Sequence, residues 1–169
     1  MDFENTILGE TDSLQQFDSR LDNREVAEQL ARQSSRQIQI LTPDLENPIY
    51  DQQNFIRSLS LLASKNRHSK IKILVRDSTH AVKSGHRILE LARKFTSSIF
   101  IHLISNEYDD VRVAYMTVDD SGYLYKHDGH LYNGTFNFYD KPKVRELNKQ
   151  FDEIWEHSHP DPECRQLTI

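Results

Sequence analysis

The sequence of 169 residues contains a single cysteine, Cys164, so it cannot form an internal disulfide bond. This fits a reducing compartment, and we expect a cytoplasmic protein. No apolar run approaches membrane-spanning length, and the first residues lack the basic and apolar regions of a signal peptide. The net charge of −5 argues against a nucleic-acid binder, because such proteins usually present a basic surface.

The first half of the sequence alternates helix patterns with strand patterns. Helices are expected to begin at Asp22, Asp51 and Ser78, where short polar side chains can cap the first turn. Strand patterns occupy residues 37–41, 71–75 and 98–104. Strands that alternate with helices imply parallel pairing through right-handed crossovers.

The second half contains strand-like runs at 111–118, 123–125 and 131–138, joined by short turns that favour antiparallel hairpins. A final helix, capped by Asp140, has the clearest amphipathic face in the chain. The predicted fold is therefore α/β, with a mixed β-sheet flanked by α-helices. We expect an N-terminal arm over residues 1–21, one domain over 22–158 and a C-terminal tail over 159–169.

This order of elements resembles one half of a phospholipase D-like domain. The resemblance covers roughly residues 23–158 and rests on the strand ending at Asp119, the Gly134-Thr135-Phe136-Asn137 turn and the closing helix. The sequence is also similar to an uncharacterised bacterial family of small phospholipase D-like domains, a domain of unknown function. Because single-half members of the superfamily dimerise, the resemblance implies a homodimer.

The residues that catalyse the superfamily's reaction are missing from this strand. Active members carry a histidine, a lysine two residues later and an aspartate five residues after that; here the three places hold Arg112, Ala114 and Asp119. The resemblance implies that the histidine attacks phosphorus and that the lysine stabilises phosphate charge. A guanidinium has no free lone pair, and Ala114 offers neither charge nor hydrogen bond. The sequence argues against that mechanism, although Arg112 retains the ability to bind a phosphate or carboxylate.

Further candidates follow the predicted parallel strands. Asp44, Arg76 and Asp77 lie just beyond two strand ends, where open α/β sheets usually bind ligands. A helix N-terminus follows Asp77 and favours an anion. Alternatively, these residues only cap a turn and a helix.

His86 follows Gly85 inside the third predicted helix. Glycine in a helix interior costs up to ~1 kcal/mol relative to alanine, so its presence there needs a reason. A structural histidine and an acid/base residue both remain open for His86.

No metal site and no cofactor are predicted. His127 and His130 sit on a turn, and the other metal-binding side chains are too distant to complete a four-ligand site.

The sequence therefore predicts a non-catalytic binding or regulatory module with an anion-binding pocket, which a second subunit could complete. The expected ligand carries a phosphate or a carboxylate. The candidate residues of the pocket are Asp44, Arg76, Asp77, His86, Arg112, Asp119 and Asn137. Two alternatives stay open: a phosphodiesterase-type hydrolase of non-standard mechanism that uses His86, and a protein-interaction module with a vestigial pocket.

Overall fold

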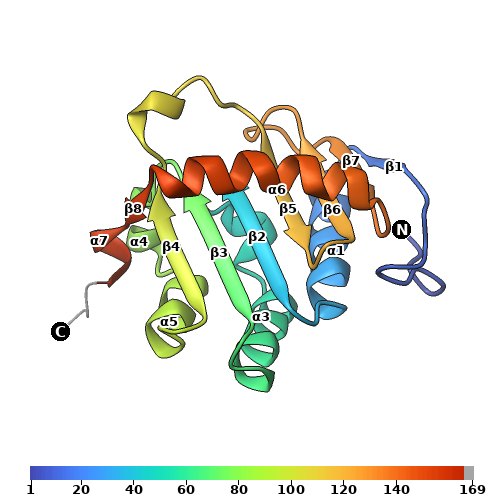
Figure 1. Ribbon diagram of the computed structural model, residues 1–169, viewed down its shortest axis with the longest axis horizontal. Coiled ribbons are helices and arrows are strands. Elements are labelled where there is room, and N and C mark those ends of the chain that lie inside the picture. The colour runs from blue at the N-terminus through green and yellow to red at the C-terminus, as the bar shows by residue number, and fades with distance from the viewer. Residues whose placement is uncertain (166–169) are drawn as a thin grey trace.

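An eight-stranded mixed sheet forms the centre of the computed structural model, which describes residues 1–165 (Figure 1). The strands are β1 (Gln15–Phe17), β2 (Gln37–Thr42), β3 (Lys70–Val75), β4 (Ile99–Leu103), β5 (Ala114–Val118), β6 (Gly122–Lys126), β7 (Gly134–Asn137) and β8 (His159–Pro160). The helices are α1 (Arg20–Arg32), α2 (Asn47–Tyr50), α3 (Gln53–Lys65), α4 (Thr79–Ser84), α5 (Arg87–Lys94), α6 (Lys141–Glu156) and α7 (Pro162–Arg165), with a 3-10 turn η1 at Asn106–Tyr108. The spatial order of the strands is β1-β7-β6-β5-β2-β3-β4-β8.

The sheet has a parallel part and an antiparallel part, as the sequence predicts. β2, β3 and β4 run parallel, each following a helix. β5 pairs antiparallel with β2, and β6 and β7 continue antiparallel beyond it. The direction of β5 decides which of its ends meets the carboxyl ends of β2 and β3.

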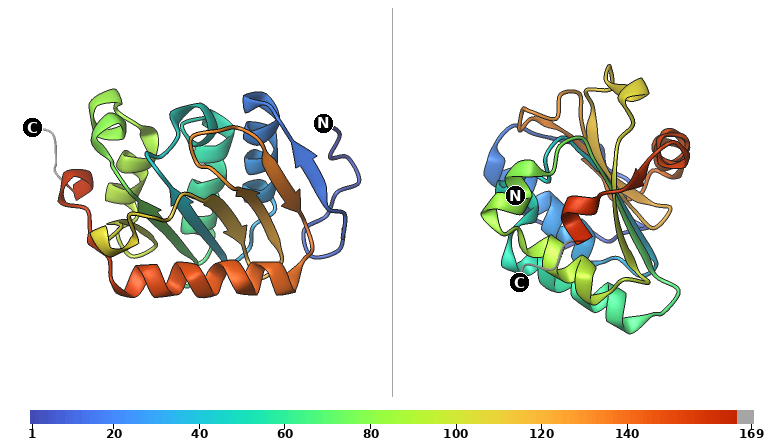
Figure 2. Two further views of the ribbon diagram at one scale, coloured as in Figure 1. Left: turned by 90° about the horizontal axis from the view of Figure 1, so that it is seen from above. Right: turned by 90° about the vertical axis from the view of Figure 1, so that its left-hand side faces the viewer.

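The two faces of the sheet are covered unequally. The helices α1, α3 and α5 lie on one face, and the long helix α6 crosses the other (Figure 2). Successive side chains of the central strands point to opposite faces of the sheet, so the strands contribute to a core on each face. Ile40 and Ile73 belong to the core beneath α1, α3 and α5, whereas Leu41 and Leu74 pack with Phe151 of α6. The predicted α/β fold with a mixed sheet flanked by helices is confirmed.

Both terminal segments add a strand to an edge of the sheet. β1, inside the predicted arm of residues 1–21, pairs antiparallel with β7. β8, inside the predicted tail of residues 159–169, pairs antiparallel with β4, and α7 follows it. Residues 166–169 of that tail lie outside the described part of the chain. The boundaries at 22 and 158 stay a prediction. Among the described residues, every helix is too short or too polar to traverse a bilayer.

Helix boundaries differ from the predicted ones where a cap or a glycine intervenes. α1 begins at Arg20, because the Ser19 side chain accepts a hydrogen bond from the Asp22 backbone N–H. The third predicted helix is two helices, α4 and α5, since Gly85 adopts a left-handed backbone with φ of 67° and ends α4. His86 then caps α5 and is not a helix-interior residue.

Asp119 fastens the end of β5 to the start of β2. Its Oδ1 accepts hydrogen bonds from the backbone N–H groups of Arg36 (2.8 Å) and Gln37 (3.1 Å), and Oδ2 accepts from the Ser35 hydroxyl (3.1 Å). The backbone of Asp119 adopts the left-handed conformation, with φ of 55°. Asp119 is a structural residue at the amino edge of β2.

Asp119→Asn is predicted to lower the free energy of unfolding by about 1–3 kcal/mol, because one carboxylate oxygen that accepts N–H groups becomes a donor. Asparagine tolerates the left-handed backbone, so little added strain is expected. Urea unfolding measures the change. The matched control is Asp120→Asn, whose exposed side chain pairs with Arg36 and Lys141, and we expect about 0.5 kcal/mol or less for it. Equal losses in both variants would contradict the structural role of Asp119.

Candidate functional site

Four of the seven predicted residues gather at the carboxyl ends of β2 and β3. The parallel register places Thr42 beside Val75, so Asp44 and Arg76-Asp77 leave the sheet side by side. The backbone N–H of Arg76 donates to the Thr42 carbonyl oxygen (3.2 Å). β5 starts at the same edge because it runs antiparallel to β2, which brings Arg112 there.

One hollow of about 120 Å³, which we term the arginine hollow, lies between these loops. Its walls include Thr42, Pro43, Arg76, Asp109, Arg112 and His130. The Arg76 guanidinium is held by the carbonyl oxygens of Val111 (2.7 Å) and Tyr108 (3.0 Å) and pairs with Asp109 (3.2 Å). The Arg112 side chain is exposed and makes no hydrogen bond or ion pair with the described residues. Among the described residues, the arginine hollow thus contains two guanidinium groups, one held by Arg76's contacts and one unpaired on Arg112, but only one carboxylate, that of Asp109.

A second hollow of about 150 Å³, the glutamate hollow, adjoins the first on the other side of His130. Asp44, Glu46, His80, His130 and Tyr132 line it, with Asn47, Pro48 and Gly129. We refer to the two hollows together as the carboxyl-edge crevice. In the described part of the chain, no group of three or more histidine, cysteine, aspartate or glutamate side chains is arranged to hold a metal ion.

The glutamate hollow lies above a buried ion pair that was not among the predicted site residues. The Lys126 ammonium donates to Glu46 Oε1, and the Lys126 side chain is only 1% exposed. Glu46 Oε2 accepts a hydrogen bond from the Thr42 hydroxyl (2.9 Å). Burial raises the pKa of the Glu46 carboxyl, while Lys126 and then Thr42 oppose that rise. Lys126 and Glu46 therefore form a buried ion pair beneath the crevice.

The turn that carries Glu46 has an unfavourable backbone. Leu45 and Glu46 both have positive φ, 69° and 33°, and a non-glycine residue in the left-handed region costs of order 1–3 kcal/mol. Three contacts hold the turn: the Leu45 N–H donates to Thr42 Oγ1 (3.1 Å), the Glu46 N–H donates to Asp44 Oδ1 (2.9 Å), and His86 binds the Leu45 carbonyl oxygen (3.0 Å). Asp44 is thus a turn-capping residue on the wall of the crevice.

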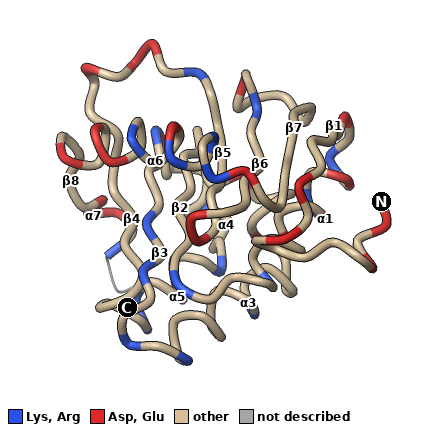
Figure 3. Tube along the Cα trace, turned by 45° about the vertical axis from the view of Figure 1, so that its right-hand side comes forward, with Lys and Arg blue, Asp and Glu red and all other residues tan. Residues whose placement is uncertain are grey.

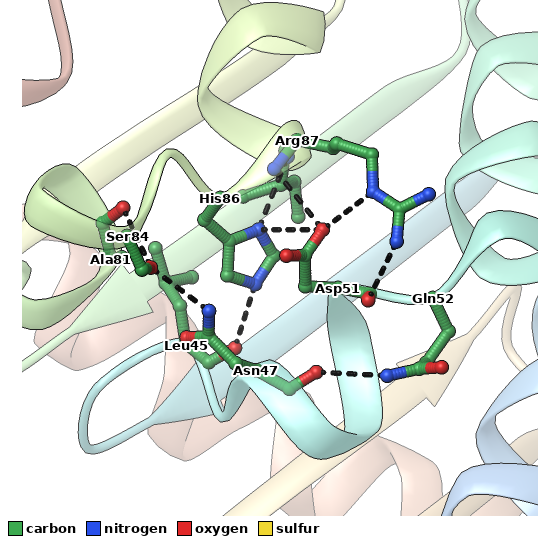
Figure 4. A network of polar contacts seen from close by, with 9 residues as sticks. Leu45, Asn47, Asp51, Gln52, Ala81, Ser84, His86 and Arg87 are labelled. Atoms are coloured by element: carbon green, nitrogen blue, oxygen red, sulfur yellow. Dashed lines mark hydrogen bonds and ion pairs between the residues drawn. The ribbon is translucent and has the colours of Figure 1, made fainter.

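His86 lies beside the Leu45 end of this turn (Figure 4) and lines neither hollow of the crevice. Its Nδ1 accepts the Ile88 N–H (3.1 Å), so Nε2 carries the proton and donates to the Leu45 carbonyl oxygen. The side chain is fully buried, with Asp51 3.9 Å from Nδ1. Asp51 also binds the Arg87 guanidinium (2.8 Å) and thereby joins α5 to the end of α2. The structural alternative for His86 fits this geometry.

Besides His86, three predicted residues do not contribute to the crevice as expected. Asp77 is exposed, and its Oδ1 accepts the Thr79 N–H (2.9 Å). Hydrogen bonding from the Thr79 side chain, and then from its backbone N–H, lowers the pKa of this carboxyl. Asp119 and Asn137 lie at the opposite edge of the sheet, because β5 and β7 end where β2 begins. Asn137 there accepts the Ser13 N–H (3.0 Å) and donates to Asp12 (2.9 Å). The prediction of one pocket containing Asp119 and Asn137 is wrong.

A larger hollow of about 390 Å³ lies between β4, α5 and α7, away from every predicted site residue. It includes Cys164, whose Sγ contacts Asp161 Oδ2 at 3.3 Å. Burial raises the pKa of the Cys164 thiol to about 12, so this thiol is not a reactive nucleophile near neutral pH.

Comparison with known families and structures identifies the relationship. The family described as Domain of unknown function (DUF7931) matches residues 19–167, most of the chain. The chain belongs to the DUF7931 family. No curated protein matches this DUF7931 sequence.

Solved structures show the fold of the DUF7931 chain. It is similar to NucT from Helicobacter pylori (12% identity, TM-score 0.66, 88% of this chain and 99% of that chain). It is also similar to Nuc from Salmonella typhimurium, a phospholipase D family member (11% identity, TM-score 0.62, 88% and 97%). The predicted phospholipase D-like fold is confirmed.

A third similar structure is TrmBL2, an archaeal chromatin protein (12% identity, TM-score 0.66). The match covers 94% of the DUF7931 chain and 57% of the TrmBL2 chain. The DUF7931 chain thus spans a little over half of TrmBL2. At these identities the likeness concerns the fold alone.

We predict that the DUF7931 protein loses stability as the pH falls below the ordinary histidine range. Burial lowers the pKa of His86 below its usual value of 6.5, although Asp51 opposes the shift. Between the unfolded and folded pKa values the unfolded chain binds more protons, so the stabilisation by neutral His86 is present above the unfolded value and is lost on acidification.

Urea unfolding at pH 7.5 and 5.5 tests this dependence. His86→Gln should be less stable than the wild type at pH 7.5, yet lose less stability on going to pH 5.5. His68→Gln is the control, because His68 is exposed on the loop before β3. An unchanged pH dependence in His86→Gln would show that His86 is not held neutral.

Proposed function

We propose that the DUF7931 chain is a non-catalytic phospholipase D-like module that binds a phosphate or carboxylate group in the carboxyl-edge crevice. One observation carries the proposal: the unpaired Arg112 guanidinium lies in the same hollow as Arg76, whose position is fixed by two carbonyl oxygens. Arginine presents a planar fork of donors that matches phosphate and carboxylate oxygens. A guanidinium held in place also loses less conformational entropy on binding.

The tight packing around Ala114 supports a non-catalytic role. Ala114 is 1% exposed, and Gly129 packs so closely that a Cβ added to it would lie 3.2 Å from the Ala114 Cβ and 3.1 Å from Pro43. The loop of residues 127–133 therefore fills the room that a longer side chain at position 114 would need. Arg112, which takes the place of the superfamily's histidine, has no lone pair for attack on phosphorus.

The hydrolase alternative that uses His86 loses its geometric support. A general base must reach the proton that it removes, whereas both ring nitrogens of His86 are bonded inside the protein. His80 and His130 lie at the crevice, but among the described residues no carboxylate orients either ring. The geometry therefore favours binding over catalysis.

The charge distribution favours a small anion over a nucleic acid. TrmBL2 is described as binding DNA, whereas the present chain has a net charge of −5. Figure 3 shows acidic and basic residues interspersed along the trace. Extended phosphate backbones are usually bound by a continuous basic surface. A homodimer and a cytoplasmic location stay predictions.

Arg112→Ala is predicted to weaken the binding of inorganic phosphate roughly tenfold or more, since a charge-assisted hydrogen-bonding partner is lost. Arg112→Lys should restore only part of the affinity, because an ammonium cannot make the bidentate contact. Isothermal titration calorimetry with phosphate and with acetate gives the constants. Arg57→Ala, which removes an exposed arginine of α3 outside the crevice, is the control. Equal binding by the wild type and Arg112→Ala would remove the basis of the proposal.

The same protein is expected to show no turnover of bis(p-nitrophenyl) phosphate, a chromogenic phosphodiester. Release of nitrophenolate is followed by absorbance, with His130→Ala and His86→Gln assayed beside the wild type. Turnover by the wild type that either histidine variant lacks would overturn the non-catalytic assignment and identify the histidine concerned.

A further inference from the structure

We infer that Lys126 is a further anion-binding cation of the carboxyl-edge crevice and that the Glu46 carboxylate masks it. This inference rests on the proposed anion-binding function and concerns the glutamate hollow, whereas that proposal rests on Arg112 in the adjoining arginine hollow. The anion would be a phosphate or carboxylate group that enters the glutamate hollow and takes the place of the Glu46 carboxylate.

Lys126 lies at the end of β6 that borders the crevice. The β5–β6 register places it directly opposite Ala114, at the strand end nearest the crevice. Its ammonium has three donors, and the structure accounts for two, on Glu46 Oε1 and on the Gly129 carbonyl oxygen (3.4 Å). The Tyr132 ring lies 5.9 Å from Nζ and covers it from the loop side.

A contribution to stability does not by itself explain the buried pair of Glu46 and Lys126. Removing a lysine and a glutamate from water is costly, and replacing a buried pair by apolar residues is often neutral or stabilising. Here Glu46 also requires two consecutive left-handed residues, held by Thr42, Asp44 and His86. The fold thus uses three side chains to keep one carboxylate in contact with one ammonium at the floor of an open hollow.

Glu46 connects Lys126 with the crevice. The residue lines the glutamate hollow, and its carboxylate contacts the Lys126 ammonium. The hollow measures about 150 Å³, and a cavity of that size holds a molecule as large as benzene. A phosphate or acetate ion therefore fits above the pair. Burial opposes ionisation of Glu46, which makes this carboxylate a weaker competitor than a solvated one.

The test is phosphate titration by calorimetry of the wild-type protein, Glu46→Gln and the double variant Glu46→Gln/Lys126→Met. Glutamine keeps the size of Glu46 and one accepting oxygen for Lys126, but it removes the charge and replaces the other oxygen with an N–H donor. We expect Glu46→Gln to bind phosphate at least fivefold more tightly than the wild type, and the double variant to lose that gain. Circular dichroism and thermal unfolding establish that each variant is folded.

Thr42→Val is a second variant in case Glu46→Gln does not fold. It removes the hydroxyl that binds Glu46 Oε2, so a smaller gain in phosphate affinity is expected. Unchanged or weaker phosphate binding by Glu46→Gln or by Thr42→Val, with Arg112→Ala still impaired, overturns the inference and leaves the proposed function standing. A gain in Glu46→Gln that persists in the double variant also overturns it, because Lys126 is then not the cation. Absence of phosphate and acetate binding in the wild type and in every variant overturns the proposed function as well.

Discussion

The antiparallel pairing of β5 with β2 is the constraint on which the site depends. It turns β5 so that its first residues, and not its last, meet the carboxyl ends of the parallel strands. Arg112 consequently joins Arg76 at the crevice. Asp119 is carried to the far edge, where its carboxylate binds the backbone at the start of β2. One strand thus has one end at the crevice and another end that holds the backbone at the start of β2.

The crevice is supported from behind by contacts between loops that are distant in the sequence. His86 reaches from the start of α5 to the Leu45 carbonyl oxygen, and Asp51 ties α5 to α2 through Arg87. Gly129 lets the loop after β6 lie against Ala114 and Pro43. These contacts fix the Glu46 turn beneath that loop, so the shape of the crevice depends on residues that never face it.

The fold was predictable from the sequence because it follows from local periodicity. The alternation of residues 37–41, the apolar run of residues 71–75, the amphipathic face of α6 and the Asp140 cap all correspond to elements of the structure. The broken helix at Gly85 was not predicted, since a glycine inside an otherwise helical pattern does not reveal whether its φ is positive. The edge strands β1 and β8 were also missed, because each is too short to produce an alternating pattern.

The site was predictable only where strand direction was certain. Asp44 and Arg76 follow parallel strands, so their shared edge could be inferred. The directions of β5 and β7 could not, and Asp119 and Asn137 were therefore misplaced. The signal for Lys126 was present: it alternates in phase with buried Leu124 along β6, which places a lysine on an inward face. Its partner Glu46 comes from a turn whose left-handed backbone no local pattern indicated.

The central claim is that Arg112 and the carboxyl-edge crevice bind an anion. A crystal structure of the protein with selenate, located by the anomalous signal of selenium, tests it most directly. The account predicts selenate in the arginine hollow, within hydrogen-bonding distance of the Arg112 guanidinium, and no such peak there in Arg112→Ala crystals. A crevice that stays empty at selenate concentrations that occupy other sites would contradict it.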